Sequence, residues 1–423
     1  MSRSVVVVGG GLAGLVAARH LADGGADVTL YEANETVGGR VTTNTDDGYT
    51  LDRGFQVLFT AYPAVQRELD LAALDLRRFS PEATIARPGK RSVLADPLGD
   101  PGAALASLRT DEVTTTDKLR TLALRQDLGT RSYDELLRRP DTSIREWLRE
   151  WGFSNQYINN FIAPFYGGIT LDRSLSTSKR VFEYTFKALS DGDSAVPAEG
   201  MAAIPKQLAA AAADAGATIT TGEAVTELTQ NRRHAVVVTD SDRRAVDAVV
   251  VATGARPAAR LTGCDSIPTE GVGCVTQHYR LPDGDDLDTG RRLLLNAGDS
   301  APNTVVPMST VAPEYAPDDA LLLNATFLGD DAVDTDSQQL AAKTRETLSA
   351  WYPERRFDGL EPLRTDRIPF AQFAQPPGVH ESLPDVRDGG RRTYLAGEYT
   401  EWSSIQGAMA SGRAAAQAVL EDY

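Results

Sequence analysis

The chain has 423 residues, two cysteines and a formal net charge of −16. This length allows a sizeable core in two domains or in one elaborated domain. The negative charge argues against nucleic acid as a partner, because phosphates would be repelled. Two cysteines are too few for a disulfide framework, and no histidine pair has metal-ligand spacing, so neither a disulfide framework nor a metal is expected. Without a membrane-spanning run or a cleavable leader, we expect a cytoplasmic protein.

Lysine is scarce in the chain and aspartate is clustered. The six lysines are Lys90, Lys118, Lys179, Lys187, Lys206 and Lys343. Aspartates gather at Asp283 to Asp288 and at Asp330 to Asp336. Dense carboxylates keep a surface hydrated when salt screens their repulsion, so we hypothesise a halophilic source organism. The alternative is simply an acidic, soluble protein.

The first elements in chain order are a strand, a glycine-rich turn and a helix. Val5 to Val8 predicts a buried strand, and the Ala/Leu-rich run after the turn predicts a helix. Between them, Gly9, Gly11 and Gly14 have GxGxxG spacing. Gly9 permits the tight turn, Gly11 lets the backbone approach a pyrophosphate, and Gly14 allows close helix packing. The helix N-terminus would then hold a diphosphate.

A second strand follows the helix, from Val28 to Tyr31, and ends at Glu32. A carboxylate at this position can accept the hydroxyls of a ribose. The order of strand, turn, helix, strand and acid therefore predicts a dinucleotide site. We expect Leu12, Ala13 and Ala33 to contact the nucleotide as well.

The segment after Glu32 narrows the type of dinucleotide. Gly38, Gly39 and Arg40 form a GGR motif. With the first motif, it resembles the superfamily of flavin-containing amine oxidases, phytoene desaturases and protoporphyrinogen oxidases. The resemblance implies FAD, with the glycines close to the cofactor and the arginine near its phosphates and ring system. It also implies that Gly54, Phe55 and Gln56 lie beside the flavin ring.

Another segment in the middle of the chain carries the same resemblance. Ala252, Thr253 and Gly254 follow an apolar strand and are similar to the superfamily's second fingerprint, in which small residues let the chain turn near the diphosphate. The resemblance also implies that Val225 contacts the adenine through its backbone.

The C-terminal segment is similar to the superfamily's third motif. The resemblance implies that Glu398, after Gly397, hydrogen-bonds the ribityl chain, where aspartate is the usual residue. Ser404 is a good N-cap for the helix that follows. The N–H groups of Ile405 and Gln406 would then face the flavin pyrimidine and stabilise the reduced ring. Ala408 belongs to the small face of this helix and is expected near the cofactor.

The rest of the chain divides into a helical part and a strand-rich part. Helices are expected at Tyr62–Leu74 and, within a mostly helical insertion from Pro101 to Leu189, at Asp117–Leu128, Tyr133–Arg138, Ile144–Trp151 and Asn155–Phe165. A hairpin is expected at Ile85–Leu94. The other expected strands are Thr218–Gln230, Ala235–Thr239, Ala245–Ala252, Cys274–Leu281, Arg292–Ala297, Asn303–Ser309 and Ala320–Phe327, with a helix at Ser337–Trp351.

This order predicts an α/β class, α+β overall. An FAD-binding Rossmann-like domain of residues 1–70, 195–268 and 375–423 would be interrupted by a discontinuous substrate-binding domain of residues 71–194 and 269–374, made of the helical insertion and an antiparallel sheet. The insertion holds an aromatic cluster of Tyr157, Phe161, Phe165, Tyr166, Phe182, Tyr184 and Phe186. These side chains can line an apolar tunnel or form ordinary helical core, and we favour the core.

The leading functional hypothesis is an FAD-dependent oxidoreductase of oxidase or desaturase type that abstracts hydride from an apolar or isoprenoid-like small molecule. Many amine oxidases place a lysine near flavin N5, whereas the matching stretch here, Gly273 to Leu281, has none. The alternatives are an amine oxidase or protoporphyrinogen-type oxidase, a nicotinamide-dependent dehydrogenase, and a non-catalytic flavin-binding protein.

The catalytic residues are the least defined part of the prediction. The candidates are Gln277, His278 and Tyr399; His278 can act as a general base, although a histidine on a strand is more often structural. Because a second GxGxxG unit is absent from the sequence, the reduced flavin would pass its electrons to oxygen, a quinone, a protein or a transient nicotinamide. A lipid substrate would require an apolar patch at the cavity mouth, and hence peripheral membrane contact. The oligomeric state is left open.

Overall fold

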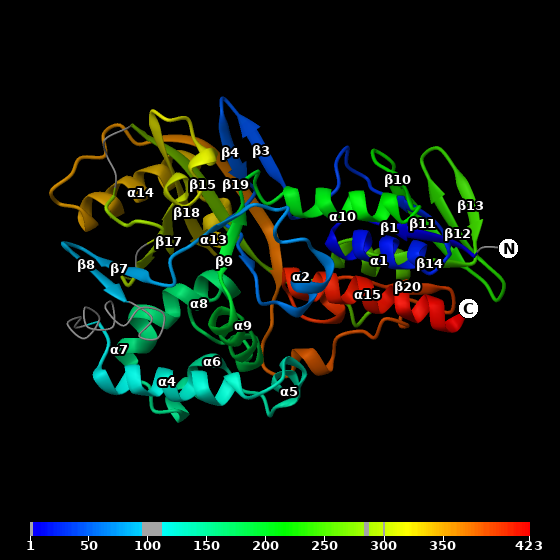
Figure 1. Cartoon of the computed structure of the whole chain (residues 1–423), viewed down its shortest axis with the longest axis horizontal. Helices are drawn as coiled ribbons and strands as arrows, with labels where there is room; N and C mark the ends of the chain where they lie inside the picture. The colour runs from blue at the N-terminus through cyan, green and yellow to red at the C-terminus, as the bar shows by residue number, and fades with distance from the viewer. Residues whose placement is uncertain (1–2, 95–111, 283–286, 299–300) are drawn as a thin grey trace.

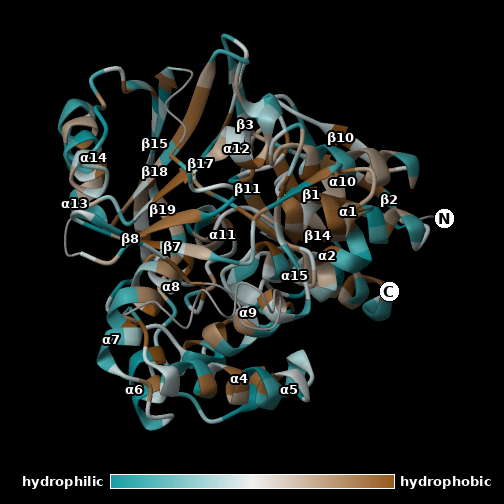
Figure 2. Ribbon diagram, turned by 60° about the vertical axis from the view of Figure 1, so that its left-hand side comes forward, coloured by the Kyte–Doolittle hydropathy of each residue, from teal (hydrophilic) through white to brown (hydrophobic). Residues whose placement is uncertain are grey.

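The computed structural model describes residues 3–94, 112–282, 287–298 and 301–423. A parallel sheet and a larger mixed sheet organise the chain, and a helical module packs beside the mixed sheet (Figure 1). The start of the predicted helical insertion, up to residue 111, and residues 283–286 of the first aspartate cluster lie outside the described residues. In Figure 2 the interior strands are largely hydrophobic and the peripheral loops largely hydrophilic.

The parallel sheet has the strand order β10-β2-β1-β14-β20. Its members are β1 (Ser4–Val8), β2 (Asp27–Tyr31), β10 (Thr218–Thr220), β14 (Ala248–Val251) and β20 (Thr393–Leu395), and every pair is parallel. The uninterrupted valines of β1 and β14 are buried because both faces of this sheet are covered. The carboxyl ends of the strands therefore meet at one edge, where ligands bind in such sheets.

Helices cover one face of the parallel sheet and a small sheet covers the other. Val5 and Val7 share a core with α1 (Leu12–Asp23), α10 (Ala203–Asp214) and α15 (Ile405–Asp422). Val6 and Val8 pack instead on β11 (Val225–Gln230), β12 (Ala235–Thr239), β13 (Arg243–Val246) and α11 (Ala255–Thr262).

Two strands predicted as continuous are divided in the structure. Thr218–Gln230 forms β10 and β11 in different sheets, because Gly222 turns the chain with φ +71°. Ala245–Ala252 is divided between β13 and β14 at Asp247, whose Oδ2 accepts hydrogen bonds from the backbone and hydroxyl of Ser4, at 2.9 and 3.0 Å. Hydropathy alone did not reveal these breaks, because the residues on either side are similar.

The helix predicted at Tyr62–Leu74 is also shorter in the structure. It forms α2 (Pro63–Glu68), and the backbone at Leu69 is extended. Asp70 then accepts hydrogen bonds from the N–H groups of Ala72 and Ala73, at 3.0 and 3.2 Å. An aspartate that bonds nearby N–H groups in this way competes with helix formation.

The mixed sheet has the strand order β19-β15-β18-β17-β16-β7-β8. Its strands are β7 (Ala83–Arg87), β8 (Lys90–Leu94), β15 (Gly271–Pro282), β16 (Leu293–Asn296), β17 (Thr304–Pro307), β18 (Ala320–Leu328) and β19 (Glu361–Phe373). The predicted hairpin is confirmed as β7 and β8. The strands expected to form an antiparallel sheet do pair antiparallel, as β15 with β18, β18 with β17 and β17 with β16. The sheet is mixed because β16 also pairs with β7 in parallel, which joins the hairpin to it.

The two faces of the mixed sheet meet different partners. One face packs on α14 (Ser337–Trp351), which begins and ends where the sequence predicted. Val306 and Leu322, on the opposite face, join the core that contains α1 and α15. This second face is therefore directed toward the parallel sheet, and any ligand between the sheets would meet it.

The helical module contains α4 (Thr115–Gly129), α5 (Tyr133–Arg138), α6 (Ile144–Glu150), α7 (Asn155–Tyr157), a π-helical turn (Ile158–Ile162), α8 (Ala163–Thr170) and α9 (Lys179–Asp191). The four helices predicted here are confirmed, and the fourth runs through the π-helical turn. The remaining elements are β3 (Thr43–Asp46), β4 (Tyr49–Asp52), β5 (Leu58–Phe59), β6 (Leu76–Arg78), β9 (Ser194–Pro197), α12 (Met308–Val311), α13 (Asp330–Asp334) and three short 3-10 helices (Pro313–Tyr315, Val379–Glu381, Glu398–Thr400).

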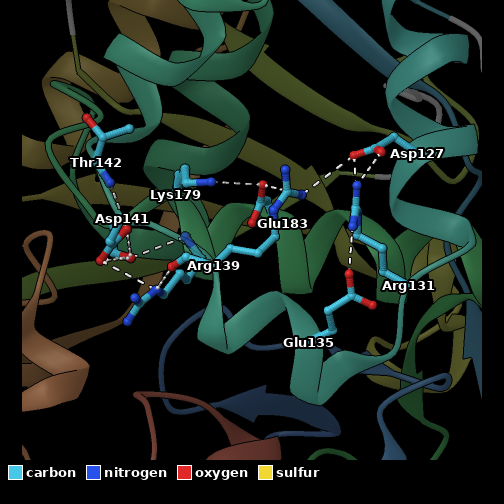
Figure 3. A network of polar contacts seen from close by, with 10 residues as sticks. Asp127, Arg131, Glu135, Arg139, Asp141, Thr142, Lys179 and Glu183 are labelled. Carbon is cyan, nitrogen blue, oxygen red and sulfur yellow. Dashed lines mark hydrogen bonds and ion pairs between the residues drawn. The ribbon is translucent and has the colours of Figure 1, made fainter.

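A buried ionic network holds α4, α5 and α9 together (Figure 3). Glu183, which is fully buried, lies 3.3 Å from Lys179 Nζ and 3.0 Å from Arg139 Nη1. Arg139 also approaches Asp127 at 3.5 Å, and Asp127 pairs with Arg131 at 2.7 Å. Burial raises the pKa of Glu183, although the two cations partly oppose this shift.

Within the described ranges, no helix combines the length and the hydrophobicity that crossing a membrane requires.

Candidate flavin and substrate site

The glycine turn after β1 has the geometry of a nucleotide cradle. Gly9 has φ +108°, and a Cβ there would lie 2.8 Å from the carbonyl oxygen of Ala252. A Cβ on Gly14 would lie only 1.9 Å from the carbonyl oxygen of Gly9. At Gly11, by contrast, a Cβ would meet no described atom within 4 Å. Packing therefore requires two of the glycines, whereas the third faces open space that a ligand can enter.

The start of α1 offers N–H groups to that space. Its N-cap is Gly11, and within the described part of the chain no side chain caps it. The first N–H groups of a helix have no intrahelical partner, so those of Leu12 and Ala13 are available to an anion. An anion at this position would also be stabilised by the helix dipole.

Glu32 closes one side of the cradle. Its Oε2 accepts a hydrogen bond from Gly10 N at 2.6 Å, and its Oε1 accepts one from Asn34 N at 2.9 Å. The exposed Ala33 lies between the acid and Asn34. Gly38 N donates to Gly10 O at 2.8 Å, so the start of the GGR motif runs beside the glycine turn. The adjacent Gly39 has φ +62°, and a Cβ there would lie 3.5 Å from Gly11 Cα.

An ion pair joins the GGR motif to the C-terminal motif. Arg40 Nη1 lies 2.5 Å from Glu398 Oε1, across 358 positions of sequence. The second carboxylate oxygen of Glu398 accepts from Ser403 Oγ at 2.8 Å. Gln56 Nε2 donates to Arg40 O at 3.0 Å, while Gln56 Oε1 is buried without a hydrogen-bond partner among the described residues. Three predicted segments thus meet, and one polar atom there is left open for a ligand.

The segment after β14 lies behind the glycine turn. Ala252 N donates to Val8 O at 2.8 Å, and Gly254 is the N-cap of α11, with the half-buried Thr253 between them. The half-buried Val225 begins β11, where it pairs with Thr239. Its segment is tied to the predicted ribose acid, because Glu223 N donates to Glu32 O at 2.9 Å.

The start of α15 is capped by a side chain. Ser404 Oγ accepts from Gly407 N at 2.8 Å, as its sequence position predicted. Gln406 Oε1 accepts from Ala64 N at 2.7 Å, so its side chain holds the start of α2 while its backbone stays at the helix end. Ile405 and Ala408 are half-buried on the same turn, and the buried Gly397 precedes Glu398.

This donor set fits FAD. The open helix end at Gly11 suits a diphosphate, the Glu32 carboxylate suits a ribose, and the unpartnered Gln56 Oε1 can accept from a ring N–H. The N-terminus of α15 suits the negative charge of a reduced ring.

The three candidate catalytic residues have different surroundings. Gln277 faces α14, where its Nε2 donates to Thr365 Oγ1 at 2.8 Å and its Oε1 accepts from Tyr279. Tyr399 donates to Val251 O at 3.1 Å, and burial raises its pKa. The side chains of Gln277 and Tyr399 are thus both held by hydrogen bonds within the protein. His278 points to the opposite face from Gln277, because side chains alternate along a strand.

His278 lies beside a carboxylate that the sequence analysis did not single out. Its Nε2 is 3.4 Å from Asp366 Oδ2, and Asp366 Oδ1 accepts from Arg364 Nε at 2.8 Å. Burial alone would raise the pKa of Asp366, but the contacts with His278 and Arg364 outweigh burial and lower it. His278 itself is 1% exposed.

Thr276 is a second residue that the sequence analysis missed. It lies two positions before His278, and therefore on the same face of β15. Its Oγ1 accepts from Phe55 N at 3.1 Å, which brings β15 against the segment expected beside the flavin ring. The period-two pattern of β15 could have indicated this pairing of Thr276 with His278, but not the contact with Phe55.

A cavity of about 200 Å³ lies between the helical module and the start of the mixed sheet. Five members of the predicted aromatic cluster line it, together with Phe79, Leu122 and Leu293; the five are Tyr157, Phe161, Phe165, Tyr166 and Phe186. The other two, Phe182 and Tyr184, are buried in the core. The cluster is helical core, as we favoured, because its members belong to or pack against hydrophobic cores, and five of them also form a cavity wall. Phe79 also contacts Phe55 edge-on, with ring centroids 6.2 Å apart, so this wall of the cavity adjoins the segment expected beside the flavin ring.

Comparison with known proteins identifies the family. Residues 12–420 match the model for flavin containing amine oxidoreductases. The chain is 30% identical to a phytoene dehydrogenase of Streptomyces griseus over 61% of this chain, and the match spans only 56% of that enzyme. It is 24% identical to the 15-cis-phytoene desaturase of Solanum lycopersicum over 99% of this chain and 78% of the relative.

Solved structures show the same fold. A proposed protoporphyrinogen oxidase from Exiguobacterium matches with a TM-score of 0.76 and 17% identity, over 100% of both chains. Putrescine oxidase bound to putrescine matches with a TM-score of 0.71 and 19% identity, over 100% of this chain and 99% of the other. The chain belongs to the flavin-containing amine oxidoreductase family and is an FAD-dependent oxidoreductase.

Proposed function

We propose that the protein dehydrogenates a long, apolar, isoprenoid-like molecule. The aromatic-lined cavity, whose lining residue Phe79 contacts Phe55, is the observation that carries this proposal. An apolar wall of this kind favours hydrocarbon chains over charged substrates. The phytoene dehydrogenase and desaturase relatives support the same substrate class.

The proposal assigns the two parts of the chain different tasks. Residues 1–70, 195–268 and 375–423 would bind FAD, and residues 71–194 and 269–374 would bind the substrate. When bound, FAD supplies the acceptor for a hydride. The turn at Gly9, Gly11 and Gly14 would hold its diphosphate, and Arg40 and Glu398 would fix the segments around it.

Removal of a hydride leaves a proton that the protein must accept. Of the three candidates, His278 is the one whose ring nitrogen Nδ1 has no hydrogen-bond partner within the described ranges, whereas Gln277 and Tyr399 are engaged. We keep His278, positioned by Asp366 at 3.4 Å, as the candidate proton acceptor.

The alternatives are less well supported. Many amine oxidases of the superfamily place a lysine near flavin N5. The matching strand here, β15, has no lysine. Family membership favours a flavin over a nicotinamide as the resident cofactor.

Anaerobic mixing of the flavin-loaded protein with 15-cis-phytoene, a long-chain primary amine or protoporphyrinogen tests the proposal. We expect phytoene to bleach the flavin; bleaching by the amine or porphyrinogen alone would refute the substrate class, and no bleaching by any of the three would favour a non-catalytic role.

Peripheral membrane contact is part of this proposal. Leu119 is 63% exposed and follows Lys118 of the cavity wall, and Val93 is 39% exposed and precedes Leu94 of the same wall. An apolar substrate held in a membrane would enter beside such residues. The cytoplasmic location, the halophilic source and the acceptor, whether oxygen, a quinone or a protein, stay predictions.

A further inference from the structure

Four buried polar atoms without hydrogen-bond partners lie on one face of the mixed sheet. They are His278 Nδ1, Thr304 Oγ1, Asn324 Oδ1 and Thr326 Oγ1, and none is bonded to any residue that the structure describes. The four residues are 1%, 3%, 2% and 5% exposed. We call these four residues the sheet cluster.

Strand register brings the sheet cluster together. On the adjacent strands β18 and β17, Thr326 pairs with Thr304; on β15 and β18, His278 pairs with Asn324. Paired residues share a face, and Asn324 and Thr326 share it too because they are two positions apart. The four side chains therefore occupy two neighbouring cross-strand rows on the face directed toward the parallel sheet.

The sheet cluster lies between the predicted flavin neighbour and the cavity. Thr276, which bonds Phe55 N at 3.1 Å, pairs with Thr326 in the same row. On the other side, a Cβ on Gly168 would lie 3.9 Å from Thr304 Cγ2. Gly168 belongs to α8, the helix whose Phe165 and Tyr166 line the cavity. A substrate that extends from the cavity toward Phe55 would thus reach these polar atoms.

A hydrocarbon alone would leave these atoms unsatisfied. Burying a polar group without a partner costs free energy, and several such groups in one place indicate a ligand or ordered water. We propose that the sheet cluster binds a hydroxyl group of the substrate, so that an oxygenated isoprenoid-like molecule binds more tightly than a plain hydrocarbon such as phytoene. This inference rests on the proposed function and narrows its substrate class.

The chemistry of the sheet cluster favours an uncharged group. Asp366, which pairs with Thr276 across the strands, has Arg364 Nε at 2.8 Å from its Oδ1, so an arginine already offsets its charge. An ammonium group would have to be buried as a charge beside Arg364, whereas a hydroxyl group carries no charge to desolvate. A hydroxyl group can donate to Asn324 Oδ1 and accept from a threonine hydroxyl at the same time.

Binding measurements on the flavin-loaded protein test the proposal with three ligands of one carbon skeleton: geranylgeraniol, the corresponding hydrocarbon and the corresponding primary amine. Titration calorimetry gives each affinity without turnover. We expect the alcohol to bind about tenfold more tightly than the hydrocarbon, because two hydrogen bonds replace unsatisfied atoms. Equal affinities, or tightest binding of the amine, would overturn the proposal.

Conservative variants locate the effect. Thr326→Val and Thr304→Val each remove one unpartnered hydroxyl and should reduce the alcohol preference at least threefold. The same changes should raise Tm of the ligand-free protein slightly, because an unsatisfied polar atom is lost. The matched control is Thr365→Val on the opposite face, whose Oγ1 accepts from Gln277; it should lower Tm and leave the preference unchanged. If Thr326→Val and Thr304→Val lower Tm and keep the preference, only ordered water satisfies the sheet cluster and the proposal fails.

The outcome is separable from that of the proposed function. If the alcohol binds through Thr326 but no isoprenoid bleaches the flavin, the proposed dehydrogenation fails and the hydroxyl site stands. If the hydrocarbon binds and bleaches the flavin as well as the alcohol does, dehydrogenation stands and the hydroxyl site fails. If none of the three ligands binds, the hydroxyl site is refuted, and the bleaching test with 15-cis-phytoene decides the proposed function separately.

Discussion

The glycine turn and the sheet cluster are two binding surfaces built in opposite ways. Around the turn, backbone packing fixes the structure. A Cβ added to Gly14 would lie 1.9 Å from Gly9 O, and Glu32 accepts a hydrogen bond from Gly10 N. On the sheet face, side chains present polar atoms that have no partner in the described ranges. The turn thus forms its hydrogen bonds and packing without a ligand, whereas the polar atoms of the sheet cluster gain partners when a ligand binds.

Because of this difference, we expect the turn to control folding and cofactor binding and the sheet cluster to control the choice of substrate. A cradle of backbone and glycine tolerates little change but recognises only general features, such as a diphosphate and a ribose. A set of side-chain polar groups can change with small effects on the fold and large effects on the choice of substrate. The predictions below test this separation, from the largest expected effect to the smallest.

Gly14→Ala should break the turn. Its methyl group would overlap the carbonyl of Gly9, so α1 cannot keep its distance from β1. We expect little folded protein and no flavin band near 450 nm, the usual absorbance of bound flavin. Gly11→Ala is the matched control: its methyl group meets no described atom within 4 Å, so the variant should fold and bind FAD roughly tenfold more weakly. Normal flavin content in Gly14→Ala would contradict the account of the turn.

Glu183→Ala should destabilise the helical module without direct effect on the flavin site. It would leave Lys179 and Arg139 without their buried partner, at a cost of about 3–5 kcal/mol in the free energy of unfolding. Urea titration of the flavin-loaded protein measures this loss. Glu135→Ala, at the half-exposed end of the same network, should cost at most about 1 kcal/mol and serves as the control. Equal losses in the two variants would show that burial is not decisive.

Glu398→Gln should weaken FAD binding while the fold is kept. The change removes the charge that faces Arg40 at 2.5 Å but preserves the shape of the side chain. A hydrogen bond between charged groups contributes about 1.5–3 kcal/mol, so the FAD dissociation constant should rise roughly 10- to 100-fold. Glu398→Asp retains the carboxylate and should lose less. Fluorescence titration of the apoprotein with FAD distinguishes the two, and identical affinities of Glu398→Gln and the parent would refute the role of this pair.

His380 should make the stability of the protein sensitive to acid. Burial lowers the pKa of His380 to about 4, whereas an unfolded histidine titrates near 6.5. Because the unfolded chain binds the proton more readily, stability should fall as pH drops from about 6.5 toward 4. His380→Asn should reduce this loss by about 1–3 kcal/mol, measured as the difference in unfolding free energy between pH 7 and pH 4.5. An unchanged pH dependence would contradict the assignment to His380.

The sequence predicted the two regions unequally. The roles of Gly9, Gly14 and Glu32 follow from spacing within one short segment, because a strand, a turn and a helix that are adjacent in sequence are also adjacent in space. The contact between Arg40 and Glu398 was not predicted as a pair, although the superfamily resemblance implied that both lie near the cofactor.

The sheet cluster could not be predicted from sequence. Its members lie on three strands, and their proximity depends on the register of Thr304 with Thr326 and of His278 with Asn324. A threonine on a strand has no local signal that distinguishes a bonded hydroxyl from an open one. The cavity wall was only the less favoured of two alternatives in the sequence analysis, because the same aromatic spacing is compatible with a filled core and with an open wall.

The most direct test of the central claim is to narrow the cavity and measure flavin reduction. Leu122→Trp places a bulky ring on the cavity wall, whereas Leu119→Trp changes the 63% exposed residue of the same helix. If an apolar substrate reaches the flavin through this cavity, anaerobic bleaching by 15-cis-phytoene should slow at least tenfold in Leu122→Trp and stay unchanged in Leu119→Trp. Equal bleaching rates in Leu122→Trp and the parent would show that the substrate does not pass through this cavity.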